Sequence, residues 1–226
     1  MIKFLFLPVF CLFFSLMTVA QQVEIFVATG YAGNNMSDLS KMNEDVISQV
    51  PFEAKVVNDF PAWFIFRASL GVVIYKNFKI GAVYNHSSTG SRVSCADYSG
   101  EYKFDVLVRG NSVGLLLGYK VFRYKNLDIQ FDAMLGAILS SCSFSEDLQV
   151  YGFQQSDALS MKAASMYINP EVSLNYWFGV IGAGVFGGFQ YDIGGILNVS
   201  GQKTTATVNW TGFRAGISLN IRFPGK

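Results

Sequence analysis

The segment FRAGISLNIRF, residues 213–223, alternates strictly between two kinds of side chain. Its odd positions are apolar, from Phe213 to Phe223, and its even positions are polar or small, from Arg214 to Arg222. A period of two is typical of a β-strand with one apolar and one polar face. The segment therefore predicts a strand at the end of the chain.

The same alternation occurs seven more times upstream. The segments are Val23 to Gly33, Phe64 to Ile74, Phe78 to Ser88, Lys103 to Phe122, Leu127 to Ala137, Ala163 to Phe178 and Val180 to Asp192. Together with the last segment they predict an all-β fold of eight antiparallel strands. In the longest segment the apolar parity changes between Asp105 and Val113, which predicts a β-bulge near Gly110.

The expected connections alternate in length. Those at 76–77, 123–126 and around Gly179 are short, whereas 34–59, 89–102, 144–162 and 193–205 are long and polar, and 38–49 has the length of a short helix. Short and long connections therefore lie at opposite ends of the strands. This segregation is typical of a transmembrane β-barrel with short periplasmic turns and long extracellular loops.

The composition of the two strand faces favours the same interpretation. The apolar face carries large rings and aliphatic side chains, whereas the polar face carries charges and glycines, so we expect a barrel whose apolar face points outward. Aromatic residues near the short turns predict a girdle at the periplasmic boundary: Tyr75, Phe78, Phe122, Tyr124, Trp177, Phe178 and Phe223.

The composition excludes other classes of protein. The 226 residues are 51% hydrophobic and 15% charged, which is incompatible with a disordered chain. The formal net charge of +1 provides no basic surface for phosphates, so a nucleic-acid partner is not expected.

The N-terminus has the pattern of a secretory signal peptide. Lys3 precedes an apolar run from Phe4 to Val19, and the small residues Thr18 and Ala20 precede an expected cleavage site. The alternative is a membrane-spanning helix, but the run is short and has no positive charge on its far side. We therefore expect a signal peptide at 1–20 and a barrel domain at 21–226.

Two cysteines remain after the expected cleavage. Cys95 and Cys142 both fall in or next to the long connections, and an oxidising compartment would permit a bond between them. A disulfide and two free thiols are both compatible with the sequence.

The polar parity of the strands predicts an ionic cluster inside the barrel. Its principal members are Arg67, Asp132, Glu171 and Arg214, with Lys79, Asp192, Glu24 and Arg222 as further candidates. An eight-stranded barrel is only wide enough for side chains to fill its interior, so no open pore is expected.

The C-terminal motif also carries a family resemblance. The pattern Arg214-x-Gly216-x-x-Leu219-x-Ile221-x-Phe223 is similar to the signal that the barrel assembly machinery reads, although the tail Pro224-Gly225-Lys226 follows the aromatic residue. Residues 21–226 resemble the bacterial outer membrane protein β-barrel domain family, in particular the small OmpA and OmpX-like barrels. The resemblance implies a place in the cell outer membrane, among its lipid and lipopolysaccharide, and partners that include the assembly machinery.

A second resemblance suggests an enzyme. His86 and Ser88 share a strand face, with Glu101 beyond the next connection, and this resembles the His-x-Ser of outer-membrane lipid A deacylases. That family follows the serine with Asn-Ala, whereas Thr89-Gly90 follows Ser88.

No other motif in the sequence points to catalysis. It contains no Cys-x-x-Cys, no histidine cluster for a metal and no phosphate-binding loop, so no cofactor or metal is expected. The favoured hypothesis is a structural, adhesion or surface-interaction role without catalysis, in which the long loops contact an extracellular protein or another surface ligand.

Overall fold

The computed structural model of the protein describes residues 22–75, 77–98, 100–199 and 201–224. Most of these residues lie in strands: β1 (Gln22–Ala32), β2 (Lys55–Asp59), β3 (Trp63–Tyr75), β4 (Phe78–Ala96), β5 (Gly100–Tyr124), β6 (Leu127–Val150), β7 (Phe153–Phe178), β8 (Ile181–Asp192), β9 (Gly195–Val199), β10 (Gln202–Val208) and β11 (Gly212–Pro224). The helix α2 (Ser37–Gln49) lies between β1 and β2. The expected signal peptide and its cleavage site lie outside the described residues.

Eight of these strands close into a ring. Its order is β1, β3, β4, β5, β6, β7, β8 and β11, and β11 returns to pair with β1, with Val23 opposite Phe223. All pairs in the ring are antiparallel. The predicted eight-stranded closure is therefore confirmed, and the three short strands β2, β9 and β10 are additions outside the ring.

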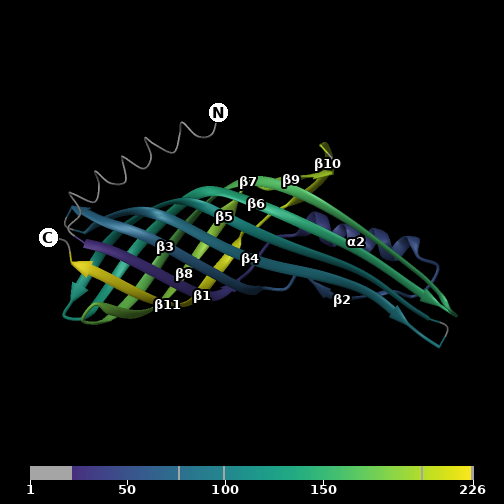
Figure 1. Ribbon diagram of the computed structural model, residues 1–226, viewed down its shortest axis with the longest axis horizontal. Coiled ribbons are helices and arrows are strands. Elements are labelled where there is room, and N and C mark those ends of the chain that lie inside the picture. The colour runs from purple at the N-terminus through teal and green to yellow at the C-terminus, as the bar shows by residue number, and fades with distance from the viewer. Residues whose placement is uncertain (1–21, 76, 99, 200, 225–226) are drawn as a thin grey trace.

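The two central hairpins, β4–β5 and β6–β7, continue far beyond the ring (Figure 1). We call this extension the blade, formed by residues 87–96, 100–110, 140–150 and 153–163. The expected long loops at 89–102 and 144–162 are therefore wrong, because these residues belong mainly to paired strands. In the connection between β1 and β2, the helix expected at 38–49 is present as α2.

The apolar face of β5 changes from the outward side in the ring to the inward side in the blade. In the ring, Val113 and Leu115 point outward and are exposed, but in the blade Val106 and Val108 point inward and are buried. The register of β5 with β4 and with β6 runs through this region without a shift. The bulge predicted near Gly110 is therefore wrong, because the surroundings of the strand change there and not its register.

The exchange occurs at one level across four neighbouring strands. Tyr84, Val113, Ala137 and Met166 are successive cross-strand partners, and all four are apolar or aromatic residues on the outward face. Four residues further toward the blade the corresponding row is Ser88, Arg109, Ser141 and Lys162. The apolar outer band of the barrel thus has a sharp upper limit on this side.

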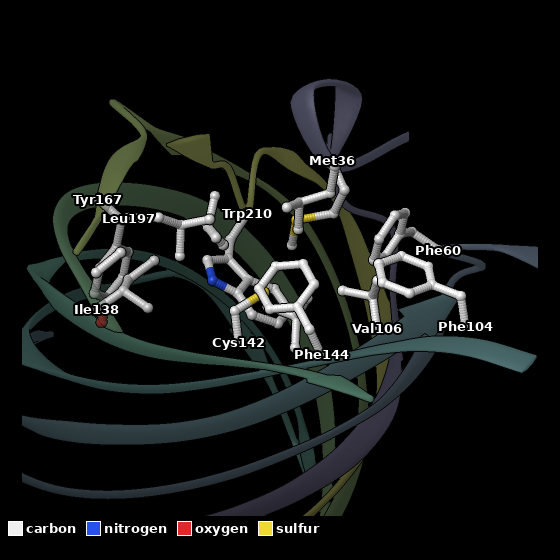
Figure 2. Close-up of a cluster of buried hydrophobic side chains, with 14 of the residues drawn as sticks. Met36, Phe60, Phe104, Val106, Ile138, Cys142, Phe144, Tyr167, Leu197 and Trp210 are labelled. Atoms are coloured by element: carbon white, nitrogen blue, oxygen red, sulfur yellow. The ribbon is translucent and has the colours of Figure 1, made fainter. Parts of the chain in front are cut away.

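The concave side of the blade holds an apolar cluster, shown in Figure 2. Trp210 is near its centre with 2% exposure, and its Nε1 donates a hydrogen bond to Ser140 Oγ at 2.9 Å. A Cβ on Gly110 would lie 2.8 Å from the Trp210 ring. Gly110 is therefore required by the close approach of this indole.

Helix α2 covers part of the same cluster. Leu39 is fully buried in it, and Met36 packs beside the start of the helix. Asp38 accepts hydrogen bonds from the backbone N of Thr207 at 3.1 Å and from its Oγ1 at 2.6 Å. These bonds lower the pKa of the Asp38 carboxyl and tie α2 to β10. The described residues contain no helix that is long and apolar enough to cross a membrane.

Candidate functional site

The ring interior contains a buried ion pair at middle depth. Arg67 Nη1 lies 2.5 Å from Glu171 Oε1, and both side chains are almost fully buried. Arg67 Nε also donates to Asn85 Oδ1 at 2.9 Å, and its guanidinium lies 4.7 Å from the centre of the Phe186 ring. The structure thus brings together two of the four principal residues that the sequence suggested.

A second ionic group lies nearer the short turns. Lys79 Nζ is 3.6 Å from Asp132 Oδ1 and 3.8 Å from Glu24 Oε2, and Lys120 Nζ is 2.5 Å from Glu24 Oε1. Lys120 was not among the sequence candidates. Its even position in β5, opposite in parity to Val113, would have identified it as inward.

Arg214 and Asp192 are buried but form no ion pair with each other among the described residues. Arg214 Nη1 donates a long hydrogen bond of 3.4 Å to Ser87 Oγ. Asp192 Oδ2 accepts the backbone N–H of Trp210 at 2.9 Å, so this carboxylate positions the segment that fills the mouth of the ring. Arg222, the remaining candidate, donates to the carbonyl of Gly179 at the turn end.

Six of the seven aromatic residues expected near the short turns are exposed there. Tyr75, Phe78, Phe122, Tyr124, Phe178 and Phe223 are all exposed next to the short turns. Trp177 is an exception, because it is 3% exposed and its Nε1 donates to Asp128 Oδ2 at 2.5 Å inside the ring. A buried indole needs a hydrogen-bond acceptor, and Asp128 provides one.

The two cysteines are free thiols. Cys95 shares a row with Tyr102 and Leu148, whereas Cys142 lies six residues from Leu148 along β6. Six residues span about 20 Å of strand, far beyond the roughly 7 Å that a disulfide permits between Cα atoms. The disulfide hypothesis is therefore wrong. Burial raises the pKa of the Cys142 thiol to about 12.

The residues of the enzyme hypothesis are not assembled into a triad. His86 Nδ1 lies 2.9 Å from Asn111 Oδ1, which also accepts from the hydroxyl of Tyr84. Glu101 is far from them: its Oε1 lies 2.7 Å from Lys103 Nζ, and its cross-strand partner on β4 is Ala96, which is eight residues from Ser88. The described residues include no group of His, Cys, Asp and Glu placed to hold a metal ion.

The residues of the C-terminal motif lie on both faces of β11. Arg214 and Gly216 point into the ring, and Leu219, Ile221 and Phe223 point outward. The whole motif is paired with β1 on one side, and all but its final residue with β8 on the other.

A cleft in the wall of the blade was not anticipated from the sequence. It has a volume of about 510 Å³ and lies where β2 and β3 separate. The residues that line it include Asn58, Trp63, Ser88, Arg92 and Asp105. No sequence pattern marks it, because its residues come from four separate strands and a connection.

No family model matches the sequence, and no curated protein matches it. Among solved structures, the chain is similar to Ail, the attachment invasion locus protein of Yersinia pestis, with 11% identity and a TM-score of 0.43 over 90% of this chain and 99% of that chain. It is also similar to the N-terminal β-barrel domain of Pseudomonas aeruginosa OprF, with 12% identity and a TM-score of 0.40 over 90% and 98% of the two chains. It is similar as well to Neisserial surface protein A, with 12% identity and a TM-score of 0.41 over 89% of this chain and 96% of that chain. All three are small outer-membrane β-barrels of the OmpA/OmpX-like type, the type that the sequence resembles.

Proposed function

We propose that the protein is an integral outer-membrane β-barrel without an open pore, and that its blade is a surface for adhesion or surface interaction outside the cell. The observation that carries the proposal is the exchange of apolar and polar faces along the long strands. An apolar outer face with an ionic interior suits a lipid environment, whereas an apolar inner face with a polar exterior suits water.

The dimensions of the apolar outer band support a membrane position. On β6 the outward residues from Ile129 to Leu139 are all apolar, and Ser141 and Ser143 follow them. At about 3.3 Å per residue and a tilt of about 40°, this stretch covers roughly 25 Å, which is the height of the apolar band in outer-membrane barrels. Its outward positions carry no charge, and a charge at the middle of a bilayer would cost about 2–4 kcal/mol.

Two levels of packing argue against a pore. The buried ion pair occupies the middle of the ring and the second ionic group its turn end, and Trp210 with its apolar neighbours fills the mouth (Figure 2). Opening a path would require separating charges in a region with little water, which is energetically costly. We infer that the barrel serves as an anchor for the blade.

The tip of the blade supports an interaction role. Tyr98, Tyr151 and Phe153 are 95%, 79% and 59% exposed, and the two hairpin ends are adjacent because Gly100 pairs with Val150. Exposed aromatic side chains are enriched at protein contact sites. Most of the surface of all three side chains faces solvent.

Labelling of intact cells tests the orientation. In a Cys95→Ser background, a Tyr151→Cys variant should react with a membrane-impermeant maleimide on intact cells, whereas an Asn126→Cys variant should react only after the outer membrane is permeabilised. Labelling of both sites on intact cells, or recovery of the protein outside the outer-membrane fraction, would contradict the proposal. Conductance across planar bilayers tests the absence of a pore, which steady single-channel openings would refute.

A further inference from the structure

The cleft in the blade wall arises from a break in the sheet. Both β2 and β3 pair with β4, but Asp59 lies opposite Ser91 and Ile65 lies opposite Ser87. Residues 60–62 therefore leave the sheet, Trp63 and Phe64 pair with β1 only, and Ser88–Gly90 of β4 have no strand partner on that side among the described residues. The resulting cleft of about 510 Å³ lies within the range of about 300–1,000 Å³ found for small-molecule sites.

The connection beside the cleft contains one residue in an unfavourable backbone conformation. Phe60 has a φ of 42°, in the left-handed region that bulky residues rarely adopt. It is held there because its side chain is buried in the apolar cluster and its backbone N donates to Gly90 O at 3.1 Å. Thr89 Oγ1 donates to Pro61 O at 3.0 Å from the other side. Strained backbone that its surroundings hold in place often accompanies a binding site.

The chemistry of the lining combines one flat aromatic ring with fixed polar groups. Trp63 is 51% exposed and lines the cleft. Arg92 binds Asp105 through two hydrogen bonds, from Nε at 2.6 Å and from Nη2 at 2.7 Å. This fork-like pair fixes both side chains and cancels their charges. Asn58 and Ser88 add an amide and a hydroxyl.

We propose that this cleft binds a neutral saccharide. A pyranose ring has a face of C–H groups, which can stack on the Trp63 indole, and a rim of hydroxyls, which can bond to Asn58, Arg92 and Asp105. A phosphate or sulfate would find no net positive charge, since Arg92 is neutralised by Asp105. Pro61, Val106 and Leu107 also line the cleft, but a lipid chain would cover the polar groups of Asn58 and Ser88 without giving them a hydrogen bond, which is unfavourable.

The inference rests on the proposed function, because it assumes that the blade faces the outside of the cell. Ser88 lies four residues beyond Tyr84, the last aromatic outward residue of β4, so the cleft begins just above the apolar band. A sugar there could belong to a glycolipid of the same membrane or to a free glycan. Both sources present the same pyranose chemistry.

The test uses the mature chain, refolded in a detergent without sugar groups. Of its three tryptophans, Trp177 and Trp210 are buried, so quenching of the fluorescence by acrylamide reports mainly Trp63. Maltose, lactose and diacetylchitobiose are the free probes, and lipopolysaccharide is the glycolipid probe. We expect at least one of them to protect Trp63 from acrylamide in a saturable manner. Protection by the free sugars identifies a soluble glycan, and protection by lipopolysaccharide alone identifies a membrane glycolipid.

Variants then assign the site. In saturation-transfer NMR, Trp63→Ala should weaken binding by about tenfold or more, since a central aromatic anchor dominates such sites. Asp105→Asn should also weaken it, because Arg92 loses its partner. Tyr191→Ala removes an aromatic of similar exposure, 55%, on β8 and is the matched control, expected to bind as the parent does.

Two results would overturn the saccharide site: no saturable protection by any of the probes, or unchanged binding by Trp63→Ala. Either result leaves the membrane position intact if the labelling of Tyr151→Cys and Asn126→Cys behaves as expected. Saccharide binding by a protein that is absent from the outer membrane would instead refute the proposed function alone.

Discussion

Removal of Glu171 should destabilise the barrel strongly. Its carboxylate is the partner of Arg67, and the guanidinium of Arg214 is buried in the same interior. Glu171→Ala would leave this positive charge without its counter-ion, and breaking a buried pair in this way costs about 3–5 kcal/mol. For an m-value of about 2–3 kcal/mol per M, the urea midpoint should fall by roughly 1–2.5 M.

A urea titration of the refolded barrel, followed by far-UV circular dichroism, measures this loss. Glu101→Ala is the matched control, because Glu101 forms an exposed ion pair with Lys103, and such pairs contribute only about 0–1 kcal/mol. The double variant Arg67→Met, Glu171→Met should lose less than Glu171→Ala, since it removes both charges. If Glu171→Ala were as stable as Glu101→Ala, the claim that this pair stabilises the interior would be refuted.

Three further predictions concern the blade and helix α2. Gly110→Val should cost about 1–3 kcal/mol, because the added atoms collide with Trp210, and should make the hairpins sensitive to limited proteolysis, whereas unchanged protection would contradict the close packing. The bonds from Thr207 lower the pKa of Asp38, so the docking of α2 is fully stabilised above the unfolded pKa of about 3.9 and weakens as the pH falls through the lower folded value. Hydrogen exchange of α2 between pH 6 and pH 3 should show this loss in the parent but not in Thr207→Val, in which α2 is already loosened. The Cys142 thiol should resist alkylation at pH 8 until the protein unfolds, because burial raises its pKa to about 12, and rapid labelling of the folded protein would contradict this.

The sequence predicted the ring well because each strand of the ring repeats one simple pattern, apolar outward and polar inward. It failed for the blade because the outward residues there are serines and charges, such as Ser141, Ser143 and Asp105, which resemble a loop when the buried inner face is not known. The inward position of Trp177 could have been predicted, since it shares its parity with Glu171.

Other features required contacts that no local pattern contains. Gly110 is a glycine because of Trp210, a hundred residues away. The cleft near Trp63 depends on where β2 leaves β4 and β3 begins, which is a property of the pairing and not of the composition. The separation of the two cysteines likewise follows from the register across three strands.

The pairing of β1 with β11 has a consequence for how the protein reaches its structure. The seam joins residues about 200 positions apart, so it needs both ends of the chain, and folds of such high contact order form slowly. Until β11 arrives, β1 and β8 each expose an unpaired backbone edge that can template pairing with other chains. The nascent chain therefore carries its greatest aggregation risk between the synthesis of β8 and the closure of the seam, and a chain truncated before residue 212 should remain in that state permanently.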